Sequence, residues 1–359
     1  MTITVKQLEA VYGDLENQDY NIYFYVPDFD KPSGGVGLTY DHVRILNENG
    51  FNANVLHTKK DFKPEWLGER GENIPIVYLE EKKLELRMQD FVFIPEGFPQ
   101  VMENLHKQKA ACKKIVFCQN WYYVLNSLQP GQFWNQFGIN ECMSVSNIQT
   151  EYLKAIMPFL RCKQVVGSID NDKFFPPENL EDKKPVVSFV NNRDPMKAHN
   201  VIKTFYAIFP HFRWIQFNEL KDLSNEDYSA AIRESAFYIH FDEVSSWGTA
   251  PIEAYLSKTL VAGWDGVGGK EYMTNDNIWL APNGDIFRLA IAIGQMIETW
   301  LLGEVKNETW SAMEKATLMY TKEEEKDSIV KAHTEYRDER MEEIERFKTL
   351  VSEQEKTNE

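Results

Sequence analysis

The sequence has no excess of basic residues, which is the first feature that a nucleic-acid-binding protein would show. Its 359 residues include 39 Lys and Arg against 55 Asp and Glu, a formal net charge of −16. A protein that binds a phosphate backbone usually gathers positive charge to do so. Nucleic acid is therefore a disfavoured partner, although a local basic groove could still serve one.

Signals for disulfides, secretion and membrane insertion are also lacking. The four cysteines, Cys112, Cys118, Cys142 and Cys162, show no CxxC spacing, and we interpret them as reduced thiols of a cytoplasmic protein. The first residues, MTITVKQLEAVYGDLENQDYN, have no apolar centre of the kind that a signal peptide needs. Because no run of about 18 apolar residues occurs, the sequence predicts no transmembrane segment.

What the sequence does contain is an alternation of short β-branched and aromatic runs with polar, helix-like stretches. This alternation is typical of α/β domains with parallel sheets. It is interrupted by DKFFPPENLEDKKP, which is rich in proline and charge. We predict two Rossmann-like domains, 1–166 and 167–320, and a charged helical tail, 321–359. The expected strands are NIYFYVP, NANVL, IPIVYL, DFVFIP, KIVFCQN, CMSVS and CKQVV, then VVSFVNN, FRWIQFN, AFYIHF, TLVAGW and NIWLAP.

A glycine-rich stretch, KPSGGVGLTYDHVRIL (Lys31–Leu46), directly follows the first of these runs. Gly34, Gly35 and Gly37 would let the backbone approach a ligand closely. A helix from about Thr39 to Asn49 would add free N–H groups and a positive dipole end. Contact with a phosphate or sugar and a turn that only packs helix on strand explain this pattern equally well. The spacing is not GxGxxG, which disfavours a dinucleotide site.

The second half resembles the donor domain of glycosyltransferases with two Rossmann-like domains, the GT-B fold. GSIDNDKFFPP is similar to their NGxDxxxFxP segment, and VVSFVNNRDPMKAHNVIKTF resembles a strand–loop–helix in which an arginine and a lysine grip the donor diphosphate. These roles fall on Arg193 and Lys197. A guanidinium and an ammonium suit a pyrophosphate leaving group. The alternative is an exposed basic pair at a helix start, where the dipole opposes a cation. Ala198 departs from the family, which usually has glycine there.

The stretch AFYIHFDEVSSWGTAPIEAYLSKTLVAGWDGVGGKEYM is similar to the signature of retaining glycosyltransferase family 4. His240 takes the family's histidine-like position, and Trp247 and Gly248 take its Phe-Gly. Glu253 takes the place of the glutamate that binds the donor ribose in the family. Gly248 and Thr249 would begin a helix whose N–H groups face the donor.

One departure concerns the family's first glutamate, which lies near the donor sugar. Ser245 stands in its place, and Glu243 lies two residues earlier. Either the loop is rearranged so that Glu243 reaches the sugar, or the site uses no such carboxylate. The catalytic candidates are therefore Glu243 and Ser245, together with Arg193 and Lys197.

In the first half, VFIPEGFP and KIVFCQNWYYV resemble segments of some bacterial and phage members. Gln119, Asn120, Trp121 and Tyr122 would follow the end of a strand, where open α/β sheets bind ligands. They are candidate acceptor residues, and their aromatic rings could stack on a sugar. Core aromatics followed by a turn explain the same letters equally well.

Two DxD patterns offer a rival interpretation, because single-domain glycosyltransferases of another fold hold a metal ion with this spacing. They are Asp28 with Asp30 and Asp170 with Asp172. The second-half pattern has no place in that fold, so we expect no metal and no cofactor beyond a nucleotide-diphosphate sugar as co-substrate.

The resemblance implies transfer of a sugar from a nucleotide sugar to a hydroxyl of a glycan, a lipid-linked sugar or another acceptor, with retention of configuration. A glycosyltransferase of a modified phage DNA base and a non-catalytic nucleotide-sugar-binding protein are the alternatives. The departing diphosphate would be stabilised electrostatically. The groups assigned to it are Arg193, Lys197, the helix start at Trp247–Thr249 and the amides of Gly34 and Gly35.

Overall fold

The computed structural model describes residues 19–81, 83–191 and 194–357. Within this range the chain divides into two compact units. Unit 1 contains the chain up to Val145, then Thr150–Val165, and the C-terminal segment from Lys326 onward; unit 2 contains Ser146–Gln149 and Val166–Glu325. The chain therefore returns to unit 1 after completing unit 2.

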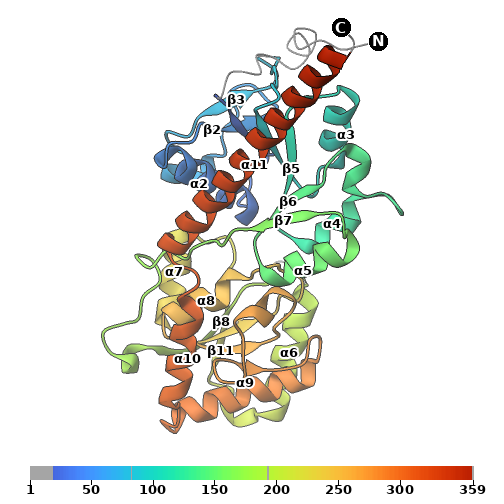
Figure 1. Cartoon of the computed structure of the whole chain (residues 1–359). Helices are drawn as coiled ribbons and strands as arrows, with labels where there is room; N and C mark the ends of the chain where they lie inside the picture. The colour runs from blue at the N-terminus through green and yellow to red at the C-terminus, as the bar shows by residue number, and fades with distance from the viewer. Residues whose placement is uncertain (1–18, 82, 192–193, 358–359) are drawn as a thin grey trace. The chain divides into compact units, whose positions relative to one another are not determined.

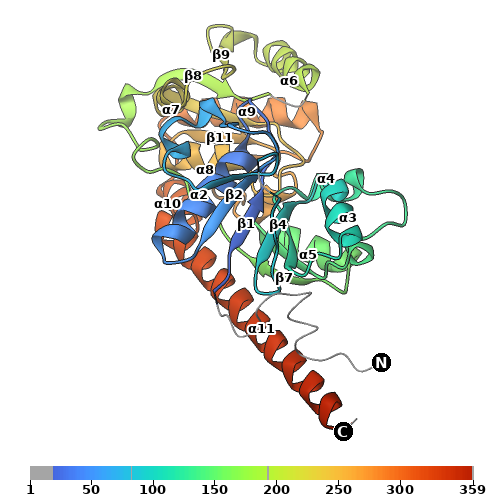
Figure 2. The ribbon, with the colours of Figure 1, turned by 90° about the horizontal axis from the view of Figure 1, so that it is seen from above.

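Unit 1 is built on a parallel sheet of seven strands in the order β3-β2-β1-β4-β5-β6-β7 (Figures 1 and 2). Helices cover both faces, so the central strands are buried on both sides and read as continuous apolar runs. Phe24 and Phe93 stack in this core with ring centroids 4.6 Å apart. The strands are β1 (Ile22–Tyr25), β2 (Ala53–His57), β3 (Ile76–Tyr78), β4 (Phe91–Pro95), β5 (Lys113–Cys118), β6 (Glu141–Ser144) and β7 (Arg161–Gln164).

The helices around this sheet include the long C-terminal helix α11 (Lys322–Thr357), which packs across the strands of unit 1. The Tyr336 hydroxyl donates to the Cys142 carbonyl at 2.9 Å, and Arg340 donates to the carbonyls of Met88 and Ala111 at 2.9 and 3.1 Å. The predicted C-terminal helix that crosses back is therefore present. The other helices are α2 (Gly34–Glu48), α3 (Pro99–Lys107), α4 (Trp121–Ser127) and α5 (Asn147–Ile156).

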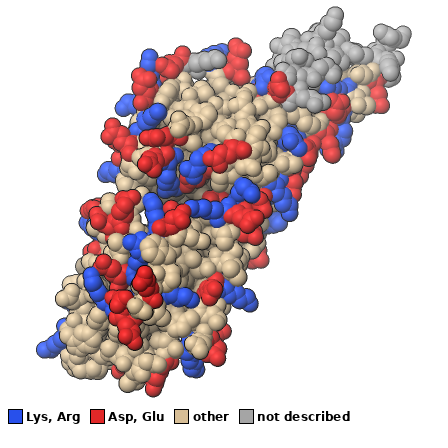
Figure 3. Space-filling view, turned by 90° about the vertical axis from the view of Figure 1, so that its left-hand side faces the viewer, with Lys and Arg blue, Asp and Glu red and all other residues tan. Residues whose placement is uncertain are grey.

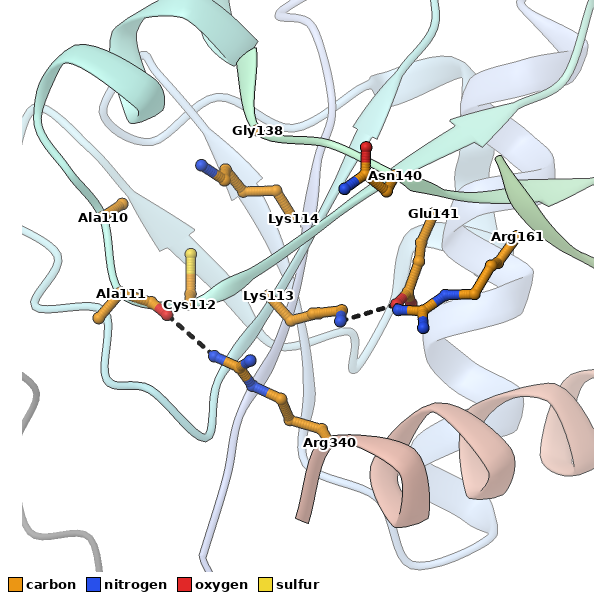
Figure 4. A pocket seen from close by; sticks show the side chains of 10 residues that line it. All are labelled: Ala110, Ala111, Cys112, Lys113, Lys114, Gly138, Asn140, Glu141, Arg161 and Arg340. Carbon is orange, nitrogen blue, oxygen red and sulfur yellow. Dashed lines mark hydrogen bonds and ion pairs between the residues drawn. The ribbon is translucent and has the colours of Figure 1, made fainter. Parts of the chain in front are cut away.

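A cavity of about 260 Å³ lies at the amino-terminal edge of this sheet, and Figure 4 shows the basic side chains that line it. Three of these cations, Lys113, Arg161 and Arg340, have acidic partners, and the Lys114 ammonium donates to the Phe137 carbonyl at 3.3 Å. The buried Glu141 pairs with Lys113 at 2.7 Å and with Arg161, and Glu343 on α11 pairs with Lys113 at 2.9 Å and with Arg340 at 3.0 Å. The network joins α11 to the strand starts, so we interpret it as structural.

Unit 2 is a second parallel sheet, with the strand order β12-β11-β10-β8-β9. Its helices α6 and α9 pack against one another, as the lower part of Figure 1 shows. The strands are β8 (Lys184–Phe189), β9 (Gln216–Glu219), β10 (Ser235–His240), β11 (Leu260–Gly263) and β12 (Trp279–Leu280). The helices are α6 (Pro195–Ile208), α7 (Asn225–Glu234), α8 (Thr249–Leu256), α9 (Ile286–Leu301) and α10 (Asn307–Thr317).

All twelve expected strands are present, and both sheets are parallel, so the predicted α/β class and the two Rossmann-like units are confirmed. The helix after the first strand differs from the prediction. It begins at Gly34 instead of about Thr39, so the glycines lie in its first turn and not in a loop before it. Gly35 suits this position because a β-carbon there would lie only 2.2 Å from the Gln119 side-chain oxygen.

A pair of buried histidines joins α11 to α2. The Nε2 atoms of His42 and His333 lie 2.8 Å apart, and the two side chains are 0% and 2% exposed. Burial lowers the pKa of His42 to about 3, and burial together with the neighbouring His42 lowers the pKa of His333 well below its usual value. Both rings are therefore neutral in the folded unit, and the Nε2–H group of one ring donates a hydrogen bond to the Nε2 atom of the other.

The pair predicts a specific loss of stability in acid. Below about pH 6.5 the unfolded chain protonates both histidines while the folded chain does not, so stability falls as the pH falls. At pH 5 His42 alone would lower the free energy of unfolding by about 2 kcal/mol relative to pH 7, and His333 acts in the same direction. We expect His42→Gln/His333→Gln to remove most of this difference in urea titrations at the two pH values. The exposed His106→Gln is the control, and an unchanged acid loss in the double variant would contradict the prediction.

Candidate functional site

The strand order of unit 2 reverses between β8 and β10, because β9 lies on one side of β8 and β10 on the other. In open α/β sheets ligands bind outside the carboxyl ends of the strands at such a reversal. The segments that leave β8 and β10 carry Lys197, in the first turn of α6, and Glu243. Their side chains form an ion pair, and the Lys197 ammonium lies 5.6 Å from the centre of the Trp264 ring. The structure thus brings together two of the four predicted catalytic residues.

The predicted Arg193 lies outside the described residues. Asp194, next to it, caps α6, and its side chain accepts a hydrogen bond from the Lys197 amide at 3.3 Å. This cap fixes the first turn of α6 and therefore the origin of the Lys197 side chain.

The loop after β10 is held by the carboxylate of Asp242. It accepts hydrogen bonds from the amides of Val244 and Ser245 at 2.9 and 3.1 Å, and from the Ser245 hydroxyl. The Ser245 hydroxyl is therefore engaged inside its own loop. The same turn leaves Glu243 directed toward Lys197, and its contact with a donor sugar stays a prediction.

The glycine-rich loop after β11 packs directly on the loop after β10. Gly266 has φ +55°, and a β-carbon there would lie 2.6 Å from the Asp242 carbonyl oxygen. A β-carbon on Gly268 would lie 2.5 Å from Ser246 backbone atoms, and the Gly268 amide donates to the Ser245 carbonyl at 2.9 Å. The two glycines thus let the backbone of the loop after β10 approach closely. This contact holds the loop after β10 in place.

Helix α8 begins at Thr249 and is capped by Gly248, as predicted; Gly248 has φ +75°. The Glu253 side chain, one turn later, is half-buried and accepts a hydrogen bond from the Tyr228 hydroxyl at 2.7 Å. Burial raises the pKa of Glu253, and its hydrogen bonds with Tyr228 and Thr249 partly oppose this shift. A carboxylate held in this way is suited to accept hydroxyl donors.

Trp247 has a packing partner on each side. A β-carbon on Gly167 would overlap its ring, and the Tyr320 ring lies 5.4 Å from it, centre to centre. Gly167 and Tyr320 lie where the chain enters unit 2 and shortly before α11. His240, at the end of β10, is buried, and burial lowers its pKa to about 4. The packed Trp247 and the buried His240 therefore both lie beside Gly248, the residue that caps α8.

The reversal in unit 1 lies between β1 and β4, and the predicted acceptor residues lie next to it. The Gln119 side chain lies on Gly35 and donates to the Thr39 hydroxyl at 2.9 Å, which donates to the Gly35 carbonyl at 2.9 Å. Asn120 caps α4 by accepting from the Tyr122 amide at 3.0 Å. The structure therefore brings the glycine turn and the start of α4 together.

The aromatic residues of α4 divide between core and surface. The Trp121 ring is partly buried and lies 5.3 Å from the Tyr152 ring, edge to face. Tyr122 and Tyr123 are 43% and 45% exposed, so their ring faces are accessible in the described chain. Such exposed aromatic faces are suited to stack on a sugar ring.

One residue of this edge was given no role from the sequence. Glu96 follows β4 directly and is only 4% exposed. Its carboxylate oxygens accept the amides of Gln119 and Asn120 at 3.1 and 2.8 Å. The signal that could have found it is a carboxylate placed directly after a buried strand, beside the reversal of the strand order.

Asp28, Asp170 and Asp172, three of the four aspartates of the DxD patterns, have protein partners. Asp28 bonds to the buried His57 ring at 2.9 Å and to the amide of Lys59 at 2.9 Å. Asp170 and Asp172 both pair with Lys322, at 2.9 and 3.0 Å. Among the described residues no group of three or more His, Cys, Asp or Glu side chains is arranged to hold a metal ion. In the same part of the chain, no helix is both long and apolar enough to cross a membrane.

Gly34 and Gly35 allow a matched test of the contact between α2 and Gln119. Nothing lies within 4 Å of a β-carbon on Gly34, so Gly34→Ala should stabilise unit 1 by up to about 1 kcal/mol through backbone entropy. Gly35→Ala gains the same entropy but displaces Gln119 and its hydrogen bond to Thr39, which offsets the gain by about 1 kcal/mol. Urea titrations compare the two variants. Equal stabilities would contradict the packing of Gln119 on Gly35.

No protein-family model matches the chain. An α-1,6-glucosyltransferase of Actinobacillus pleuropneumoniae serotype 7 (strain AP76) is 26% identical over 253 residues, which are 70% of this chain and 74% of that protein. The chain is similar to this protein, and the 253 matched residues include parts of both predicted domains.

Solved structures match over most of their length. The pneumococcal O-GlcNAc transferase GtfA, in complex with UDP and GlcNAc, has a TM-score of 0.66 at 9% identity, over 90% of this chain and 99% of that one. HepE of Anabaena, in complex with UDP-glucose, has a TM-score of 0.64 at 13% identity, over 88% and 99%. The sucrose-phosphate synthase of Thermosynechococcus elongatus has a TM-score of 0.61 at 11% identity, over 89% and 99%. With its two parallel sheets and returning C-terminal helix, the chain has the GT-B fold of these structures.

Proposed function

We propose that the chain is a glycosyltransferase that moves a sugar from a nucleotide-diphosphate sugar to an acceptor hydroxyl, with retention of configuration and without a metal ion. The observation that carries the proposal is the Lys197–Glu243 pair at the strand reversal of unit 2. The expectation of a glycosyltransferase agrees with the names of the sequence relative and of GtfA, and with the UDP-glucose bound to HepE.

In this proposal Lys197 binds the donor diphosphate. Its ammonium has three donor hydrogens, and the Glu243 carboxylate need not take all of them. The amides at the start of α8 add further donors and the positive end of the helix dipole. Glu253, half-buried beside Tyr228, would accept the ribose hydroxyls. Arg193, Gly34 and Gly35 stay predictions for the same diphosphate.

Bond cleavage at the anomeric carbon leaves positive charge on the sugar and negative charge on the diphosphate. Lys197 would stabilise the leaving group, because a fixed cation at the position where negative charge grows lowers the barrier. Glu243 lies beside it and would face the positive sugar. Ser245, whose hydroxyl bonds to Asp242, would keep the Glu243 turn in shape.

The acceptor is proposed to bind at the carboxyl edge of unit 1, along Gln119, Asn120, Trp121 and Tyr122. The exposed Tyr122 and Tyr123 rings support an acceptor that contains sugar. The face of the molecule in Figure 3 shows basic side chains interspersed with acidic ones, which gives a DNA backbone no continuous basic track on that face.

UDP-glucose is the first donor to test, since the sequence relative is named a glucosyltransferase and HepE was solved with UDP-glucose. Lys197→Met should weaken donor binding in calorimetry by about tenfold to a hundredfold, the range for a lost hydrogen bond to a charged group. The exposed Lys203→Met, on the same helix α6, is the matched control. EDTA should change neither affinity nor turnover.

Glu243→Gln separates catalysis from binding. It removes the carboxylate but leaves Lys197 in place, so donor affinity should be retained while turnover falls. Proton NMR of the product formed by the wild type reports whether the anomeric configuration of the sugar is retained. Donor binding without any turnover by the wild type would favour the non-catalytic binding protein. Absence of binding to every nucleotide sugar would contradict the proposed function.

A further inference from the structure

Both ends of helix α4 are attached to one buried residue, Glu96. The carboxylate of Glu96 accepts the amides of Gln119 and Asn120, the two residues that connect β5 to α4. Its carbonyl oxygen accepts the Ser127 hydroxyl at 2.9 Å, in the last turn of α4.

The attachment continues from Gln119 into the glycine turn. The Gln119 backbone is fixed by Glu96, and its side chain bonds to Thr39 and lies on Gly35. A single chain of contacts therefore joins the three segments that leave β1, β4 and β5. These three strands are neighbours at the reversal of the strand order in unit 1.

Resting on the function proposed above, we propose that Glu96 is a positioning residue that sets the acceptor-binding geometry of the Gln119–Tyr123 segment without touching the acceptor. At 4% exposure the Glu96 side chain is covered, so it acts only through the residues that it holds. The residues that it presents are the Gln119 amide group and the exposed rings of Tyr122 and Tyr123.

The surroundings of Glu96 make this geometry sensitive to pH near neutrality. Burial raises the pKa of Glu96 to about 7, although the amides of Gln119 and Asn120 lower it in part. The titratable groups that face it are the thiols of Cys118 on β5 and Cys142 on β6. Burial raises the pKa of both thiols, so they stay neutral and the response at neutral pH belongs to Glu96.

The direction follows from the hydrogen bonds. The ionised carboxylate accepts both amides, whereas the protonated form places a hydroxyl hydrogen against one of them. One amide then loses its acceptor, and the start of α4 loosens. The apparent KM for acceptor should therefore rise as the pH falls through about 7, by about threefold to tenfold for one lost hydrogen bond. The KM for donor should not follow it.

The experiment uses steady-state kinetics of the full chain from pH 5.5 to 8.5, with hydrogen exchange of the 119–127 segment as a second readout. Glu96→Gln has one carbonyl oxygen for two amides, so it should show the high acceptor KM at every pH, an unchanged donor KM, and faster exchange of the Gln119 or Asn120 amide. Glu103→Gln on α3, whose side chain is exposed and pairs with Lys107, is the control and should match the wild type.

The outcomes separate this inference from the proposed function. If the wild type turns over and Glu96→Gln has the wild-type acceptor KM and pH profile, the positioning role is overturned. If the wild type transfers no sugar, the proposed function fails, and unchanged exchange at residues 119 and 120 in Glu96→Gln would overturn the Glu96 role independently. Should Glu96→Gln not fold, the wild-type pH profile decides: an acceptor KM that stays constant from pH 5.5 to 8.5 would contradict the inference.

Discussion

The ion pair between Lys197 and Glu243 is the interaction on which the functional account depends. It joins the segments that leave two neighbouring strands, β8 and β10, at the point where the order of the strands reverses. The carboxyl ends of parallel strands meet at one edge, and at the reversal their helices lead away to opposite sides. Side chains from two distant parts of the sequence can meet there, with space left for a ligand.

The two units use different means to shape the same kind of edge. In unit 2 the loops pack by close backbone contact, with Gly266 and Gly268 against residues 242–247, and an ion pair lies at the surface of that packing. In unit 1 a buried carboxylate, Glu96, accepts the amides of the adjoining loop. The partly exposed Lys197 and Glu243 can also interact with a charged ligand. Glu96 is covered, so its carboxylate interacts only with the backbone around it.

Much of this fold could be predicted from the sequence because buried parallel strands consist of short, continuous runs of apolar residues. Each expected run became a strand, and the proline-rich break fell between the two sheets. The resemblance to the family signature also placed the start of α8 at Gly248 and Thr249. These features depend on residues that are close together along the chain, which is why they are legible without the structure.

The remaining features depend on which strands become neighbours. The first turn of α2 is helical and Gly35 in it lies against Gln119, 84 positions away, whereas the sequence pattern placed the helix start later. Nothing in VFIPEGFP indicates that Glu96 binds the amides of residues 119 and 120. The packing of Trp247 on Gly167 and Tyr320 likewise joins three segments that the sequence separates. Strand order decides all three.

The most direct test of the central claim is hydrogen-exchange mass spectrometry of the chain with and without UDP-glucose, extended to other nucleotide sugars if the first does not bind. The account predicts that donor slows exchange in residues 194–200 and 242–253, the start of α6 and the β10–α8 loop with its helix. Protection that appears elsewhere in unit 2 but leaves both segments unchanged would contradict the assignment of the donor diphosphate to Lys197 and its neighbours.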